Sequence, residues 1–144
     1  MSNFTLDDSI GYNINIAANF LKKHLNQTFK SAGYDVTSEQ WSILNRLWEK
    51  DGINQLEIAG ITLKDNASVT RTLELMEKKG LIVRQIDQDD RRNRRIYLTE
   101  AGKALRKPLI HCAESVLKKA TVDISAEEIS LLNELSRRII ENLR

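Results

Sequence analysis

Cysteine, proline and histidine are scarce in this chain of 144 residues. The single cysteine, Cys112, excludes an internal disulfide framework and a cysteine-rich zinc site, and it fits a reducing compartment. The two histidines, His24 and His111, show no metal-binding spacing. The sequence also lacks an HExxH motif, a P-loop, a dinucleotide fingerprint and a GxSxG motif. We therefore expect no metal, no cofactor and no enzymatic activity.

Long apolar runs and a strong charge of either sign are also absent. No run approaches the roughly 20 apolar residues of a membrane-spanning helix, and the acidic start MSNFTLDDSIG lacks the regions of a signal peptide. We therefore expect a cytoplasmic protein with no membrane partner. The net charge of +2 excludes a generally basic protein but permits a local basic surface. Length and composition favour a single domain over residues 1–144.

Most of the chain carries the apolar period of a helix. One such face covers about residues 8–29, and Gly33 should end that helix. Further helices should begin after five capping residues: Thr37, Asn54, Asp65, Thr99 and Ser125. Three of these caps are followed by the acidic or amide side chain that completes a capping box: Gln40, Glu57 and Glu128.

The period changes after KKG, where Gly80 should adopt the left-handed conformation that ends a helix. LIVRQI (81–86) and RIYLT (95–99) are typical of two strands joined by a charged loop. A long helix should follow to about residue 121, with a kink at Pro108.

The central elements are helices 37–50, 54–61 and 65–79 followed by the hairpin 81–99. This order, with a three-residue turn before the third helix, is a winged helix-turn-helix plan. The fold class is therefore mainly α with a small β-hairpin, in which residues 37–99 form the DNA-binding core. Residues 6–30 and 100–144 would supply dimerisation helices.

The loop between the two strands places three aspartates and four arginines in nine positions, 87–95. Arginine suits the narrow minor groove and binds phosphate through two hydrogen bonds. Asp87 and Asp90 can pair with neighbouring arginines and stiffen the tip; Arg91 or Arg95 are the candidates for that pairing. Because the loop sums to only +1, the alternative is a self-neutralising, solvated turn, but its place after a helix-turn-helix favours a wing. The predicted DNA contacts are Arg91, Arg92 and Arg94.

The outer face of helix 65–79 should approach base edges in the major groove. Asn can recognise adenine and Arg can recognise guanine, whereas Ser, Thr and Lys suit phosphate contacts. The alternative is a polar solvent-exposed face, with Asp65 as a cap and Arg71 bridging to Glu74. The predicted contacts are Lys64, Asn66, Ala67, Ser68, Thr70 and Arg71.

The segment from INQLEIAG to LTEAGKAL, residues 53–105, resembles the DNA-binding core of the MarR family of bacterial transcription regulators. The resemblance rests on VTR…LE…KKGLI, on the D-x-x-D-R-R wing and on LTEAGKAL. The chain departs from the pattern at Asn54, where Ser or Thr is common, and at Gln88, where Pro is common. The resemblance implies an obligate homodimer on a pseudo-palindromic operator, with Arg92 in the groove, and we expect a repressor. The alternative function is a winged-helix module that binds protein without recognising DNA.

The flanking helices carry apolar stripes that exceed the needs of one small winged domain. In a dimer they would interleave across the two-fold axis; the alternative is that they fold back on their own chain. The predicted interface residues are Leu6, Ile10, Ile14, Ile124, Leu131, Leu135, Ile139 and Leu143.

The resemblance also implies a possible pocket for a small aromatic or phenolic effector between the dimer helices and the winged domain. The candidate lining residues are Phe20, His24, Tyr34, Trp41, Trp48 and His111. The alternative is that these aromatic residues are plain core. For Cys112 the choice lies between an oxidation sensor and a small buried hydrophobic residue, and the second is favoured.

Overall fold

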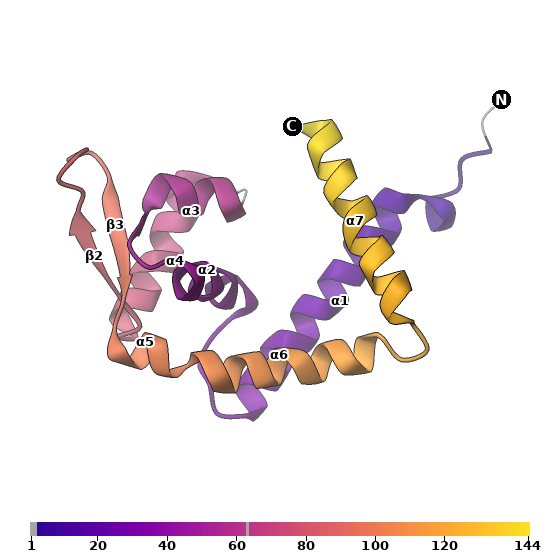
Figure 1. The fold of residues 1–144 in the computed structure, drawn as a ribbon, viewed down its shortest axis with the longest axis horizontal. Coiled ribbons are helices and arrows are strands. Elements are labelled where there is room, and N and C mark those ends of the chain that lie inside the picture. The colour runs from indigo at the N-terminus through magenta and orange to yellow at the C-terminus, as the bar shows by residue number, and fades with distance from the viewer. Residues whose placement is uncertain (1–2, 63) are drawn as a thin grey trace.

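The computed structural model describes residues 3–62 and 64–144, and its helices and strands follow the predicted winged helix-turn-helix order (Figure 1). Residues 1–2, and residue 63 in the predicted turn, lie outside the described residues. The helices are η1 (Leu6–Asp8), α1 (Ile10–Ser31), α2 (Ser38–Glu49), α3 (Gln55–Thr62), α4 (Asn66–Lys78), α5 (Glu100–Ala104), α6 (Arg106–Ala120) and α7 (Ala126–Leu143). The strands are β1 (Ile53–Asn54), β2 (Ile82–Ile86) and β3 (Arg94–Leu98).

Capping side chains set the helix starts as predicted. The complete capping boxes of Thr37 with Gln40 and of Ser125 with Glu128 open α2 and α7. Asn54 also caps α3, since its Oδ1 accepts the backbone N–H of Glu57 at 2.9 Å. The Glu57 carboxylate, however, contacts the Asn54 side-chain amide at 3.3 Å, because Asn, unlike Ser or Thr, carries a donor beside its capping oxygen.

The core lies where α2, α3 and α4 meet the sheet and α6. The inner face of α4 consists of Val69, Leu73 and Met76, as the apolar spacing predicts. Cys112 of α6 is buried in the same cluster, which fits the small hydrophobic role predicted for it. The largest fully buried side chains are Phe29, Leu44, Leu47, Ile58, Leu73, Met76, Ile82, Ile96 and Leu109.

The sheet has one strand more than the predicted hairpin. Its antiparallel order is β1-β3-β2, so β3 is central and the hairpin strand β2 is an edge. Strand β1 has only two residues, with Ile53 opposite Ile96 and Asn54 opposite Arg95. Two residues carry too little alternation to predict a strand from sequence. The pairing fixes the backbone immediately before α3 against the base of the wing.

The long helix predicted after Thr99 is interrupted at Leu105, between α5 and α6. The interruption lies three residues before Pro108, because the proline ring clashes with the carbonyl four residues earlier and supplies no N–H to it. The predicted kink is therefore confirmed, and its position is explained by Ala104, the residue whose carbonyl loses its partner.

Gly102 brings α5 into close contact with the end of the winged domain. A Cβ atom at this position would collide with the backbone carbonyl oxygen of Leu81. The Trp48 indole N–H donates to the Gly102 carbonyl at 3.0 Å, which ties α5 to α2 as well. Gly102, the glycine of the LTEAGKAL motif, is therefore required by the close packing of α5 against the backbone of Leu81.

In Figure 1 the strands and α2–α4 lie on one side, α1 and α7 lie on the other, and α6 runs between them. In α7, which the structure describes in full, no residue is buried. Seven predicted interface residues are between 42% and 81% exposed, and the eighth, Ile139, is half-buried. The exposed seven are Leu6, Ile10, Ile14, Ile124, Leu131, Leu135 and Leu143. The apolar stripes therefore do not fold back on their own chain.

Within the described ranges, none of the helices combines the length and the apolar character needed to cross a bilayer.

Candidate nucleic-acid interface

The N-terminal turn of α4 presents a polar outer face. Asp65 caps the helix: its Oδ1 accepts the Ser68 backbone N–H at 2.8 Å and its Oδ2 accepts the Ser68 hydroxyl at 3.1 Å. These hydrogen bonds, the backbone one first, hold the pKa of Asp65 below its ordinary value. Asp65 is thus occupied as a cap, as predicted.

The predicted contact residues of α4 lie on or near this face. Asn66, Ala67 and Arg71 are exposed, whereas Ser68 and Thr70 are half-buried. The Arg71 guanidinium donates to the Ser68 hydroxyl at 3.3 Å, so the bridge considered with Glu74 is replaced by a bond to the residue one turn earlier. This weak exposed bond leaves most of the Arg71 donors available.

Gln55 connects α3 to the outer face of α4. Its amide nitrogen donates to the Thr70 hydroxyl oxygen at 2.7 Å and to Asn66 Oδ1 at 3.3 Å. Its side chain is buried at the junction of the two helices. Two predicted DNA-contact residues therefore share one buried hydrogen-bond donor that the sequence did not single out.

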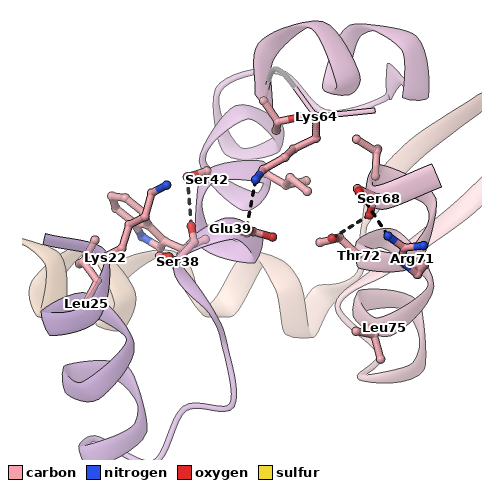
Figure 2. A pocket seen from close by; sticks show the side chains of 14 residues that line it. Lys22, Leu25, Ser38, Glu39, Ser42, Lys64, Ser68, Arg71, Thr72 and Leu75 are labelled. Atoms are coloured by element: carbon pink, nitrogen blue, oxygen red, sulfur yellow. Dashed lines mark hydrogen bonds and ion pairs between the residues drawn. The ribbon is translucent and has the colours of Figure 1, made fainter. Parts of the chain in front are cut away.

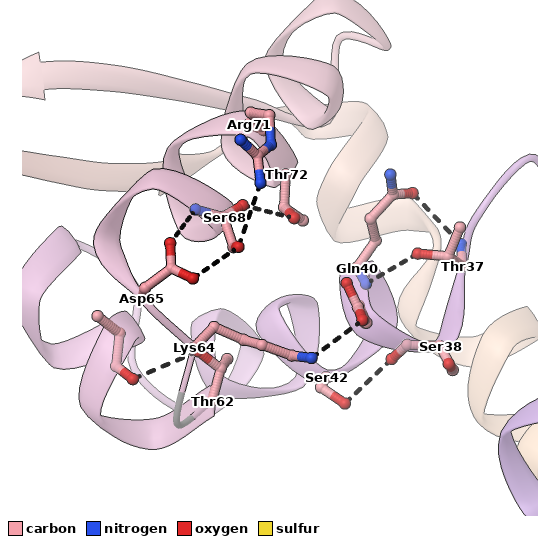
Figure 3. A network of polar contacts seen from close by, with 12 residues as sticks. Thr37, Ser38, Gln40, Ser42, Thr62, Lys64, Asp65, Ser68, Arg71 and Thr72 are labelled. Atoms are coloured by element: carbon pink, nitrogen blue, oxygen red, sulfur yellow. Dashed lines mark hydrogen bonds and ion pairs between the residues drawn. The ribbon is translucent and has the colours of Figure 1, made fainter. Parts of the chain in front are cut away.

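Lys64, a predicted DNA contact, has an acidic partner on α2. Its ammonium is 3.6 Å from the Glu39 carboxylate at the start of α2, and Figure 3 shows the Lys64 side chain extended toward the first turn of α2. Both side chains are about half exposed, at 50% and 55%, so the pair contributes at most about 1 kcal/mol. Lys64 thus points into the space between α2 and α4 instead of over the outer face of α4.

The wing is braced by one buried acid. The Asp87 carboxylate accepts the backbone N–H of Asp89 at 2.9 Å and lies 3.4 Å from the Arg95 guanidinium. These two contacts, in that order of size, hold the pKa of Asp87 below its ordinary value. Arg95 also donates to the Gly52 carbonyl at 2.9 Å, which attaches the wing to the α2–β1 turn. Of the two arginines considered for internal pairing, Arg95 has this role.

The wing tip is closed by two hydrogen bonds that Asp90 accepts. Asp90 accepts the backbone N–H of Arg92 at 3.2 Å through its side chain, and its carbonyl accepts from Asn93 at 2.9 Å. Within residues 3–62 and 64–144, Arg91, Arg92 and Arg94 form no side-chain ion pair, and all three are exposed. These hydrogen bonds close the tip, on which the Arg91 and Arg92 side chains are exposed, while the Arg94 side chain is exposed at the start of β3.

A second ion pair joins the wing to α4. The Arg84 guanidinium of β2 donates to the Glu77 carboxylate of α4 at 3.1 and 3.3 Å, and the Arg84 backbone N–H donates to the same group at 3.2 Å. Hydrogen bonds from Arg84 lower the pKa of Glu77. Since both groups are partly buried, the wing and α4 are held as one surface.

Comparison with known proteins identifies this arrangement. The model of the MarR family matches residues 36–93. The transcriptional regulator SlyA, a solved structure, is 30% identical, with 94% of each chain covered and a TM-score of 0.82. The chain belongs to the MarR family of transcriptional regulators.

Two further relatives extend the comparison. The transcriptional regulator HosA of Escherichia coli O127:H6 is 29% identical over 106 residues, which cover 74% of this chain and 78% of HosA. BpsR of Bordetella bronchiseptica, whose DNA binding is regulated by 6-hydroxynicotinic acid, is 20% identical, with a TM-score of 0.84 and 96% and 97% of the two chains covered. At this identity the likeness to BpsR shows the fold alone. MarR-family regulators are generally not enzymes.

The residues predicted for an effector pocket in this MarR-family chain lie on different surfaces. Phe20 and His24 line an open cleft of about 340 Å³ between α1 and α6. Tyr34 and Trp48 pack against the core, and His111 is exposed on α6. The predicted pocket residues therefore do not gather around one cavity. Helix α1 lines one cleft with α6 and another with α2, and it uses different residues for each.

Trp41 lines a larger cleft of about 570 Å³ between α1, α2 and α4 (Figure 2). Lys22 enters it from α1, Arg71 from α4 and Lys64 from the turn before α4, while Glu39 is its one acidic lining residue. In the described part of the chain, the Trp41 indole nitrogen is buried without an acceptor. The lining of the cleft is therefore aromatic and cationic, and it includes residues of α4.

Among the described residues, no group of three or more His, Cys, Asp or Glu is arranged to hold a metal ion.

Replacing Asp87 with Asn should lower the free energy of unfolding at neutral pH, because the amide loses the charge that Asp89 and Arg95 stabilise. The folded-state pKa of Asp87 is depressed. Its stabilisation is therefore complete above the unfolded pKa of about 3.9 and is lost as pH falls through the folded value. Urea unfolding at pH 7, 5.5 and 3 measures the difference in free energy of unfolding between wild type and Asp87→Asn. This difference should be equal at pH 7 and 5.5 and smaller at pH 3.

The matched control is Asp89→Asn, which removes an exposed charge of the same loop and keeps the backbone donor. The free energy of unfolding of this variant should differ little from that of the wild type at all three pH values. A gap for Asp87→Asn that stays the same at pH 3 would mean that the charge of Asp87 does not brace the wing.

Proposed function

We propose that this MarR-family protein is a homodimeric repressor that binds a pseudo-palindromic operator in the cytoplasm. The observation that carries the proposal is the joint surface of α4 and the wing. The polar outer face of α4 and the three exposed wing arginines lie on elements that the Arg84–Glu77 ion pair joins. A rigid surface with these two parts matches the major groove and an adjacent minor groove.

The contacts divide by chemistry. Asn66 and Arg71 carry the donors that recognise base edges, and Ala67 can pack against a thymine methyl group. Ser68 and Thr70 lie on the same face, but their hydroxyl protons are donated to Asp65 and to the Asn66 backbone carbonyl, so a phosphate contact from either would exchange that bond. Arg91, Arg92 and Arg94 supply positive charge to the minor groove and its phosphates, where narrow grooves concentrate negative potential. Lys64, which faces Glu39, is left out of this set unless DNA draws it outward.

A homodimer is supported by the uncovered apolar stripes of η1, α1 and α7. A monomer seldom exposes so many large apolar side chains along one terminal helix. A symmetric dimer would cover them with the same stripe of a second copy. It would also place two copies of α4 about 34–36 Å apart, one turn of B-form DNA. Such a dimer represses by occupying the DNA that it covers.

An effector would act through the cleft between α1, α2 and α4. Its three cations and one acid favour an anion, and the Trp41 indole favours an aromatic ring. BpsR, a protein of the same fold, is regulated by 6-hydroxynicotinic acid. A ligand in this cleft can change DNA affinity only if it binds the DNA-competent and incompetent arrangements unequally.

Replacing Arg92 with Ala should weaken binding to an operator selected from random duplex DNA by about tenfold or more, equivalent to about 1.4 kcal/mol. The slope of log K against log salt should become shallower by about 2, because each of two wings loses one phosphate-neutralising charge. Fluorescence anisotropy at four salt concentrations measures both quantities.

Lys118→Ala removes an exposed cation from the far end of α6 and serves as the control (Figure 1). It should leave affinity and slope unchanged. If the wild type showed no salt dependence, the protein-binding alternative would replace DNA recognition. An effect of Arg92→Ala no larger than that of the control would remove the wing from the mechanism.

Leu135→Glu should convert the dimer to a monomer, because it introduces a charge into the middle of the apolar stripe of α7. The fold of each chain should survive, since Leu135 is 42% exposed within its own chain. Sedimentation equilibrium at micromolar concentration measures the mass, and circular dichroism monitors the helices. Asn133→Glu, on an exposed position of the same helix, should remain dimeric. A dimeric Leu135→Glu protein would place the interface elsewhere.

Adding 6-hydroxynicotinic acid should quench the fluorescence of Trp41 and lower operator affinity about fivefold or more. The variant Trp48→Phe leaves Trp41 as the only tryptophan and makes the signal unambiguous. Lys22→Ala should weaken both responses. No change in fluorescence or affinity at millimolar ligand would exclude this ligand class from the cleft.

A further inference from the structure

Gln55 is a buried polar residue whose side chain reaches the outer face of the recognition helix. It is 9% exposed and is the first residue of α3, directly after strand β1. Its backbone is therefore held by the β1–β3 pairing on one side and by α3 on the other. A side chain on so fixed a base can impose a geometry on its partners.

The orientation of the Gln55 amide follows from counting protons. The Thr70 hydroxyl has one proton, and it donates that proton to the backbone carbonyl oxygen of Asn66 at 2.8 Å. Toward Gln55, 2.7 Å away, the Thr70 oxygen can then only accept. The group of Gln55 that faces α4 must be the amide nitrogen.

The same nitrogen fixes the orientation of Asn66. It lies 3.3 Å from Asn66 Oδ1, which accepts its second N–H. The Asn66 side chain therefore turns its oxygen toward the protein and leaves its amide nitrogen, with two N–H donors, for groups outside. Asn66 is exposed at the start of α4, where a base edge would lie.

We propose that Gln55 is a specificity-determining residue that acts through Asn66: it makes Asn66 a hydrogen-bond donor toward the DNA. This inference rests on the proposed function. Guanine presents two acceptors in the major groove, O6 and N7, and thymine presents O4, whereas cytosine presents the N4 donor. The base facing Asn66 is therefore guanine or thymine in preference to cytosine. The two-bond contact of Asn with adenine is weakened, because Asn66 Oδ1 is already occupied.

The decisive variant is Gln55→Glu, which replaces the donor by an acceptor of the same shape. A carboxylate accepts from the Thr70 hydroxyl and from the Asn66 amide nitrogen, so Asn66 turns its oxygen outward. The preference at that one position should change to cytosine or adenine, which present donors. Gln55→Met has similar volume and no hydrogen bond, and it should relax the preference without reversing it. Asn66→Ala should remove it.

The experiment is selection of bound sequences from random duplex DNA with the full-length wild type and the three variants. Circular dichroism and urea unfolding establish that each variant is folded; if Gln55→Glu does not fold, Gln55→Met decides the question. Among sequences bound by the wild type, cytosine should be depleted about tenfold at one position of each half-site. A purely structural role for Gln55 would lower affinity for all sequences equally and leave every base preference unchanged.

The outcomes separate the two proposals. If wild type selects an inverted repeat and Asn66→Ala alters one position while the Gln55 variants alter none, Gln55 does not orient Asn66. If Asn66→Ala also alters nothing, Asn66 does not recognise a base. Both results overturn the inference and leave the proposed function standing. If wild type selects no sequence, the proposed function fails and this inference fails with it.

Discussion

The ion pair between Arg84 and Glu77 is the constraint on which the interface depends. A hairpin with one two-residue neighbour strand is a weak structure alone. Arg84 ties the edge strand of this hairpin to α4, and Arg95 ties its central strand to the α2–β1 turn. With both attachments in place, the wing is tied to α4 and to the α2–β1 turn, so in the proposed complex the exposed arginines and the outer face of α4 would bind DNA as one surface.

The remainder of the molecule positions this surface. Core residues of α2 and α6 pack the winged domain against α6, whereas η1, the early turns of α1 and most of α7 leave their apolar side chains exposed. The charged cleft between α1, α2 and α4 lies between these two parts. A change in the angle between them would alter the cleft and the spacing of two recognition helices together, which is why occupancy and DNA affinity would be coupled.

Local patterns predicted most of the fold and part of the site. The caps at Thr37, Asp65 and Ser125 are where the sequence places them, because capping depends on residues only three positions apart. Strand β1 was missed, since two residues carry no period. Lys64 was expected on the outer face of α4, and its pairing with Glu39, 25 positions away in the chain, could not be predicted from local sequence. The six aromatic and histidine residues expected around one pocket were dispersed by the different packing of each helix face.

The sequence by itself determined which residues form helices, which side of α4 is apolar and that the wing is rich in arginine, because each depends on neighbours within a turn or two. Only the tertiary structure decided which arginine braces the wing, that α7 is left uncovered by its own chain, and that Gln55 meets Asn66 and Thr70. These depend on the meeting of side chains far apart in sequence, and hydrogen bonds are too short-ranged and directional to be inferred without the backbone that brings the partners together.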